Sequence, residues 1–282
     1  MSGDASPVPV RERAIGVFDS GVGGLTVLRA LVEALPQEQF LYLGDTARLP
    51  YGTKSAETVV RYALRAADEL VERGIKCLVV ACNTASAAAL GAMRQRFEDI
   101  PVIGVIEPGA RAAVAASRTG RIAVIATEGT VRGGAYTQAI ARLRPDAVVT
   151  AMACQLFVAL AEEGWTEGPV AERAAERYLA ALRGAAGAGP DTLVLGCTHF
   201  PLLQGVIERA LGGQVRIVDS AATTAQATRA LLAQQDLLRT SSLQAAPQLR
   251  YLATDGAERF AQVGSRFMGR AIAADEVELV DL

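Results

Sequence analysis

Two cysteines occupy equivalent places in two copies of a short sequence pattern. The first copy, residues 78–86, reads LVVACNTAS, and the second, residues 193–199, reads LVLGCTH. In each copy an apolar run suited to a buried parallel strand ends at a thiol, Cys82 or Cys197, and polar residues follow. Ligands of open α/β sheets bind beyond the carboxyl ends of the strands. We therefore expect these two thiols to face one small molecule.

A thiol at the junction of a strand and a helix is suited to proton transfer. The free backbone N–H groups at a helix start favour an anion. We therefore expect the pKa of both thiols to lie below the ordinary value of about 8.5. A lone cysteine in an apolar strand is usually a buried, inert residue, and we interpret Cys77 in this way. The repetition of the pattern favours a functional role for Cys82 and Cys197.

His199 is the only histidine of the chain and follows Cys197 by two positions. It could cap the next helix, or it could exchange a proton with Cys197. A cysteine hydrolase would also need an orienting group and an oxyanion hole. That alternative leaves Cys82 without a role.

The sequence offers little to a cofactor or a metal. The loop DSGVGG at residues 19–24 lacks the third glycine of a dinucleotide fingerprint. Lys54 and Lys76 are the only lysines, and neither stands in a setting typical of a pyridoxal phosphate Schiff base. No His, Cys and carboxylate residues have the spacing of metal ligands. We expect neither a cofactor nor a metal.

Composition narrows the class of protein further. The 282 residues are 51% hydrophobic and carry a formal net charge of −2. This balance gives no electrostatic case for nucleic acid as a partner. We find no signal peptide and no apolar stretch long enough to span a bilayer, and the four cysteines form no CxxC pair. We expect a cytoplasmic protein with reduced thiols and a small-molecule substrate.

Predicted strands alternate with predicted helices along most of the chain, which favours an α/β fold with a doubly wound parallel sheet. The order of strand, polar loop and helix restarts near residue 122. We therefore expect two pseudo-symmetric lobes with an active-site cleft between them. The predicted organisation is a disordered tail at 1–13, a first lobe at 14–107 plus 219–282, and a second lobe at 108–218.

Several local predictions follow from the same pattern. Residues 102–106 are expected to form a strand closed by Glu107–Pro108–Gly109. Residues 44–52 and 127–134 are expected to be loops, as is the segment around Cys154. A Gly/Ala-rich linker is expected before Pro190.

Four ordered motifs resemble the signatures of bacterial glutamate racemases. They are IGVFDSGVGG at 15–24, GDTARLPYG at 44–52, ACNTAS at 81–86 and GCTHFPL at 196–202. Gln155, Ala159 and Gly133 depart from residues common in that family. The resemblance covers about residues 14–220 and leaves both thiols in place.

The resemblance implies a cofactor-independent enzyme that interconverts L- and D-glutamate and supplies D-glutamate for peptidoglycan. It implies that Cys82 and Cys197 act as opposed acid and base, with Asp19 assisting Cys82 and His199 assisting Cys197. It also implies a homodimer. By the same resemblance the substrate would be bound by Asp19, Ser20, Tyr51, Gly52, Asn83, Thr84, Thr198 and His199. Further candidates for the cleft are Asp45, Thr127, Thr130 and Glu163.

Two other functions fit the same residues. One is a related two-thiol racemase that acts on aspartate or a hydantoin. The other is a non-catalytic binding protein, or an inhibitor of a partner such as DNA gyrase. Simple binding does not need a pair of thiols, which favours an enzyme.

Overall fold

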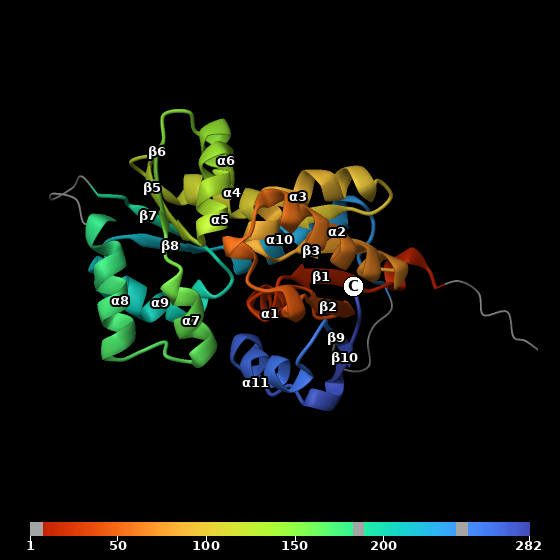
Figure 1. Cartoon of the computed structure of the whole chain (residues 1–282). Helices are drawn as coiled ribbons and strands as arrows, with labels where there is room; N and C mark the ends of the chain where they lie inside the picture. The colour runs from red at the N-terminus through yellow and green to blue at the C-terminus, as the bar shows by residue number, and fades with distance from the viewer. Residues whose placement is uncertain (1–7, 183–188, 241–247) are drawn as a thin grey trace, which may run out of the picture.

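The computed structural model describes residues 8–182, 189–240 and 248–282, which form two lobes (Figure 1). The sheet of the first lobe has six parallel strands in the order β10–β9–β2–β1–β3–β4. The predicted pair of parallel-sheet lobes is confirmed. The strands of this sheet are β1 (Ile15–Asp19), β2 (Phe40–Gly44), β3 (Cys77–Val80), β4 (Val102–Gly104), β9 (Leu249–Ala253) and β10 (Val277–Leu279).

The sheet of the second lobe has four parallel strands in the order β6–β5–β7–β8. Its two central strands are almost fully buried, as expected where helices cover both faces. The edge strand β6 has no buried residue and contains both exposed and half-buried positions. The strands are β5 (Arg121–Ala126), β6 (Val148–Ala153), β7 (Thr192–Gly196) and β8 (Arg216–Asp219).

Helices surround both sheets. In the first lobe and at its junction with the second they are α1 (Leu25–Ala34), α2 (Ala56–Glu72), α3 (Asn83–Arg96), α4 (Ile106–Ala116), α10 (Ser220–Gln234) and α11 (Ala257–Met268). In the second lobe they are α5 (Glu128–Gly133), α6 (Ala135–Leu143), α7 (Leu156–Glu163), α8 (Pro169–Leu179) and α9 (Gln204–Leu211). No helix in the described ranges is long and apolar enough to cross a membrane.

Strand register brings the chemically active loops to one edge of each sheet. Ile15 of β1 lies opposite both Phe40 of β2 and Cys77 of β3. The carboxyl ends of these strands therefore stand level, and the loops that follow them share one edge. In the second lobe the register aligns Ala126 of β5 with Gly196 of β7, so the loops after β5 and β7 also lie together.

Helix α10 connects the two lobes. It follows β8 of the second sheet, and the Asp219 side chain caps its first turn by accepting a hydrogen bond from the Ala221 N–H at 2.8 Å. The helix then packs against α1 of the first lobe and α4 (Figure 1). The chain continues into β9 and β10, which extend the first sheet.

Several local predictions were wrong. Strand β4 stops at Gly104, and Glu107–Pro108–Gly109 lie in the first turn of α4, where proline is tolerated. Residues 127–134 contain the short helix α5, and the segment after Cys154 forms α7. Residues 44–52 include two 3-10 turns, Thr46–Arg48 and the start of Tyr51–Thr53.

The predicted tail and linker are only partly within the described residues. Residues 1–7 and 183–188 lie outside them. Val10–Glu12, which we expected to be disordered, form a 3-10 turn, and the Arg11 carbonyl accepts a 2.7 Å hydrogen bond from the buried Lys76. The domain boundaries remain a prediction. The boundary that we expect between residues 107 and 108 falls within helix α4.

Candidate active site

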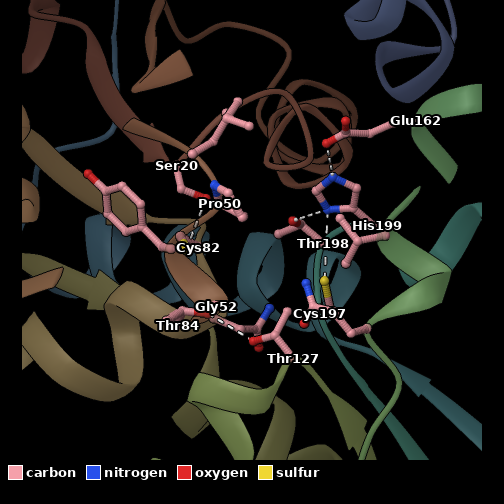
Figure 2. Close-up of a pocket in the computed structure, with 16 residues that line it drawn as sticks. Ser20, Pro50, Gly52, Cys82, Thr84, Thr127, Glu162, Cys197, Thr198 and His199 are labelled. Carbon is pink, nitrogen blue, oxygen red and sulfur yellow. Dashed lines mark hydrogen bonds and ion pairs between the residues drawn. The ribbon is translucent and has the colours of Figure 1, made fainter. Parts of the chain in front are cut away.

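One small cavity lies between the lobes and contains both cysteines in its wall (Figure 2). Its volume is about 50 Å³, whereas a water molecule needs roughly 10–15 Å³. An amino acid is much larger than water and can enter only if the walls move apart. The lining residues are Ser20, Gly21, Leu49, Pro50, Tyr51, Gly52, Cys82, Asn83, Thr84, Thr127, Gln155, Val158, Glu162, Cys197, Thr198 and His199.

Cys82 lies between β3 and α3 and is the N-cap of that helix. Its Sγ accepts a hydrogen bond from the Ala85 N–H at 3.4 Å, and its thiol donates to Ser20 Oγ at 3.5 Å. Burial, together with the negative charge of Asp19, raises the pKa of the Cys82 thiol to about 12. The expectation of a lowered pKa was therefore wrong for Cys82, because burial outweighs the helix N-terminus.

Asp19 ends β1 and lies beneath the cavity wall without lining it. Its Oδ2 accepts a 2.9 Å hydrogen bond from the Gly21 N–H, whereas its Oδ1 is buried without a partner in the described part of the chain. Burial raises the pKa of Asp19, although the charge of His199 and nearby N–H groups oppose this effect. A side chain at Gly24 would come within 2.5 Å of Asp19 Cβ, so glycine is required there.

Cys197 lies after β7 and is paired with His199. The distance from Cys197 Sγ to His199 Nδ1 is 3.8 Å, and His199 Nε2 lies 3.0 Å from Glu162 Oε1 (Figure 2). The chain continues into a 3-10 turn, Phe200–Leu203, so Cys197 does not cap an α-helix as Cys82 does. The predicted helix start after Cys197 was wrong in this respect.

His199 is positioned to be a cation. Burial alone would lower its pKa, but hydrogen bonds and charge from Cys197 and Glu162 raise it to about 10. The hydrogen bond to His199 correspondingly lowers the pKa of Glu162, although burial opposes this. At neutral pH the second lobe thus places an imidazolium beside the Cys197 sulfur, where it stabilises negative charge.

Glu162 was missed, and its neighbour Glu163 was named in its place. Glu163 is exposed and does not line the cavity, so that prediction was wrong. Helical spacing distinguishes Glu162 from Glu163. Val158 and Glu162 are four residues apart on α7, so they share the helix face that lines the cavity. The distinction depended on recognising α7, which we had expected to be a loop.

The two lobes meet tightly around the cavity. Thr26 Oγ1 of α1 donates to the Thr198 carbonyl at 3.0 Å, and the Tyr136 hydroxyl donates to Asn83 Oδ1 at 2.8 Å. A Cβ added at Gly23 would lie 2.4 Å from Thr198 Oγ1 and from His199 Cε1. The glycine loop of the first lobe therefore permits contact with the His199 loop of the second.

Three hydroxyls form a second bridge between the lobes. Thr84 Oγ1 of α3 lies 3.0 Å from Thr127 Oγ1 and 3.3 Å from Thr130 Oγ1, and the last two are 3.0 Å apart. Thr84 and Thr127 line the cavity (Figure 2), whereas Thr130 lies behind them. Thr130 is placed to support the other two rather than to form the wall.

The site residues predicted in the loop at 44–52 also divide into residues that line the cavity and a residue that supports them. Tyr51 and Gly52 line the cavity, and a Cβ at Gly52 would lie 2.9 Å from Thr127 Cβ. Asp45 is fully buried outside the wall, where it accepts hydrogen bonds from the Tyr51 hydroxyl at 2.5 Å and from Thr254 Oγ1 at 2.9 Å. Asp45 therefore holds the loop in place.

Polar atoms without partners are available to a ligand. Asn83 Nδ2 and Gln155 Oε1 are buried and have no hydrogen-bond partner among the described residues, and both residues line the cavity. Buried polar groups of this kind are costly unless a ligand or water satisfies them. Among the described residues, no group of three or more His, Cys, Asp or Glu side chains could hold a metal ion.

Most of the cavity wall was predicted from the sequence. The cavity brings together ten of the predicted residues: Ser20, Tyr51, Gly52, Cys82, Asn83, Thr84, Thr127, Cys197, Thr198 and His199. Besides Glu162, the lining residues that were not predicted are Gly21, Leu49, Pro50, Gln155 and Val158. Leu49 and Pro50 belong to a recognised motif, whereas Gln155 and Val158 depend on α7.

These features define a two-lobed α/β protein with opposed thiols in an interlobe cavity. A family model described as Asp/Glu/Hydantoin racemase matches residues 15–228. The chain belongs to this family.

Three proteins to which this chain is similar are glutamate racemases. A glutamate racemase from Geobacter metallireducens is 56% identical over 257 residues, covering 91% of this chain and 93% of the relative. The crystal structure of glutamate racemase from Thermus thermophilus in complex with beta-chloro-D-alanine is 42% identical, with a TM-score of 0.85 over 97% of this chain and 99% of that one. The glutamate racemase of Francisella tularensis, in complex with D-glutamate, is 35% identical with a TM-score of 0.88 over 96% and 98%.

Proposed function

We propose that this protein is a glutamate racemase, which interconverts L- and D-glutamate by proton transfer at Cα. The observation that carries the proposal is that Cys82 and Cys197, from different lobes, line one small cavity. The similarity to glutamate racemases over nearly the whole chain, including one in complex with D-glutamate, supports this choice of substrate.

Racemisation needs a base on one face of Cα and an acid on the other. One thiol removes the proton as thiolate, the other delivers a proton to the opposite face, and turnover exchanges their protonation states. Before substrate binds, the surroundings favour a protonated Cys82, whereas the sulfur of Cys197 lies beside the His199 imidazolium. The two sulfurs therefore have different electrostatic surroundings before the substrate enters.

The remaining polar groups are placed to bind an amino acid. In the cavity wall, Asn83 Nδ2 and the hydroxyls of Thr84 and Thr198 can donate to carboxylates. Asp19 Oδ1 lies outside the wall without a partner among the described residues, and it can accept a bond from the ammonium group once the walls move apart. Donors aimed at the carboxylate next to Cα stabilise the charge that develops when the proton leaves. Closure of the lobes excludes water and strengthens these contacts.

The same proposal covers the cofactor requirement, the product, the cellular compartment and the oligomeric state. The reaction uses no cofactor, and its product, D-glutamate, is supplied to peptidoglycan synthesis. We place the enzyme in the cytoplasm, where thiols stay reduced, and we propose a homodimer, which size-exclusion chromatography with light scattering would test.

Deuterium exchange tests the function. In D₂O the purified protein, without added cofactor, should introduce deuterium at Cα of L-glutamate and of D-glutamate, while circular dichroism decays to zero from either side. L-Aspartate and a 5-substituted hydantoin, run in parallel, distinguish the related racemases. Exchange with neither glutamate enantiomer would contradict the proposal, and glutamate binding without exchange would indicate a binding protein.

A further inference from the structure

The C-terminal helix of the first lobe contacts the histidine site of the second. Helix α11 lies beside α7 (Figure 1), and its residues reach three parts of the His199–Glu162 pair. Arg266 Nη1 donates to the Glu162 carbonyl at 2.5 Å, and Arg259 Nη2 lies 3.6 Å from Glu162 Oε2. The ring of Phe267 meets the His199 ring edge-on, with centroids 5.0 Å apart.

Arg266 lies at the C-terminal end of α7, where backbone carbonyls lack partners within the helix. This helix ends at Glu163 and is capped by Gly164, where φ is +77°. The N–H groups of Gly164 and Trp165 donate to the carbonyls of Ala161 and Leu160. The Glu162 carbonyl is one of the last four of the helix, which have no partner within it. Arg266 supplies that partner and adds a positive charge at the negative end of the helix dipole.

Gly164 also leaves room for the arginine. A Cβ at this position would lie 3.2 Å from Arg266 Cζ, so the guanidinium packs directly over the backbone of the turn. Arg266 thus contacts the end of α7 in two ways. It donates to the Glu162 carbonyl, which has no partner within the helix, and it packs over Gly164, which has no side chain.

We propose that Arg266 is a positioning residue for the His199–Glu162 pair, which holds the end of α7 so that Glu162 stays in contact with His199. The contact crosses between the lobes, so the pair is fully held only when α11 and α7 are together. Arg266 acts through Glu162 and touches neither the cavity nor the reacting atoms. This inference refines the proposed function but does not require it, because its main test measures a proton rather than turnover.

The single histidine makes the test direct. With one histidine in the chain, its NMR signals can be followed against pH without assignment. The charged and titratable groups facing it are Cys197 on its own loop, Glu162 from α7 with Arg259 beside it, and Asp19 from β1. We expect Arg266→Ala to lower the measured pKa of His199 by about one unit, a shift of the size produced by partial loss of one ion pair.

Matched variants separate positioning from stability. Arg270→Ala removes a nearby arginine whose partner, the Tyr251 hydroxyl, is within the first lobe, and it should leave the His199 titration unchanged. Arg266→Lys retains a positive charge and an N–H donor group, so its His199 pKa should lie between those of the native chain and Arg266→Ala. In a Glu162→Gln background, Arg266→Ala should have no further effect on the pKa, because the group through which it acts is gone.

Two results would overturn the proposal. One is a lower melting temperature for Arg266→Ala with an unchanged His199 titration, which would indicate a purely structural role. The other is an equal additional shift in the Glu162→Gln background. If the protein racemises glutamate, kcat should fall roughly tenfold to a hundredfold with little change in KM, whereas absence of racemisation would affect the proposed function and leave the titration result intact.

Discussion

The two lobes place a cysteine at the same point of the fold and surround it with opposite charges. Cys82 is next to the carboxylate of Asp19 and is held as a protonated thiol, whereas Cys197 is next to the imidazolium of His199. The difference shows that the strand end only sets where a thiol stands. Asp19, at the end of β1, and His199, on the same loop as Cys197, give the two sulfurs opposite electrostatic surroundings.

The largest expected effect comes from removing either thiol. Cys82→Ser and Cys197→Ser should each reduce racemisation of both enantiomers by at least the roughly 10²–10⁴-fold contribution of general acid–base catalysis. A serine hydroxyl is far too weak an acid to exchange protons in the same way. Stereochemical assays by circular dichroism provide the measurement.

Cys77→Ala is the matched control for both serine variants. Cys77 is buried within β3 and does not line the cavity, so the variant should retain its activity. Full activity of either serine variant would show that one thiol is sufficient and would remove the basis of the comparison between lobes.

The charged neighbours should have opposite effects on the two thiols. Asp19→Asn removes a negative charge that raises the pKa of Cys82, so alkylation of Cys82 by iodoacetamide should become faster near pH 9. His199→Asn removes a cation from beside Cys197, so alkylation of Cys197 should become slower. We expect kcat to fall on the order of a hundredfold in each variant.

Peptide mass spectrometry can measure each cysteine separately across pH. Rates that change in the same direction in both variants would contradict the assigned difference between the lobes. The doubly substituted protein should show both changes at once.

The contact between the lobes is expected to have a smaller effect. Gly23→Ala would place a methyl group 2.4 Å from the His199 ring, which is itself held by Glu162 and Phe267. The glycine loop must therefore retreat, and kcat/KM should fall roughly tenfold to a hundredfold because the reacting groups are displaced. Steady-state kinetics with both enantiomers will measure this loss.

Gly91→Ala supplies the control for that substitution. Gly91 is exposed on α3, and an added Cβ meets nothing within 4 Å. Alanine should stabilise this helix by about 0.5–1 kcal/mol without a change in activity. Equal activity of the two alanine variants would mean that the loops move apart freely, and that their contact does not position His199.

The two lobes also differ in how many of their cavity-wall residues could be predicted from the sequence. In the first lobe the wall residues lie in the motifs around Ser20, Tyr51 and Cys82, in the loops that follow β1, β2 and β3, so the local sequence pattern predicted them. In the second lobe Glu162 stands on a helix that lacked a clear start signal, since Gln155 as N-cap makes no side-chain cap bond. The error of one residue, Glu163 for Glu162, follows from that missed helix.

Other features depended on contacts that sequence spacing does not reveal. Arg266 reaches the Glu162 carbonyl across 104 positions of the chain. The pKa of Cys82 depends on how deeply the closed lobes bury it, and a strand-to-helix pattern predicts only the helix N-terminus. The expected reduction of that pKa was wrong because burial is a property of the assembled molecule.

The smallest effect should be seen in stability against pH, and it concerns the second lobe alone. The folded-state pKa of His199, about 10, lies above its ordinary value of 6.5, so the folded state holds a proton that the unfolded chain has lost at intermediate pH. The resulting stability is fully present below pH 6.5 and is lost as pH rises toward 10. Between about pH 7 and 8, below the ordinary range of cysteine titration, the free energy of unfolding should therefore decrease with rising pH. Urea denaturation should show this slope in the native chain and a flatter one in His199→Asn, where the proton is absent from both states. An equal slope in both proteins would mean that His199 is neutral in the folded state, and the charge difference between the two cysteine sites would then have to be abandoned.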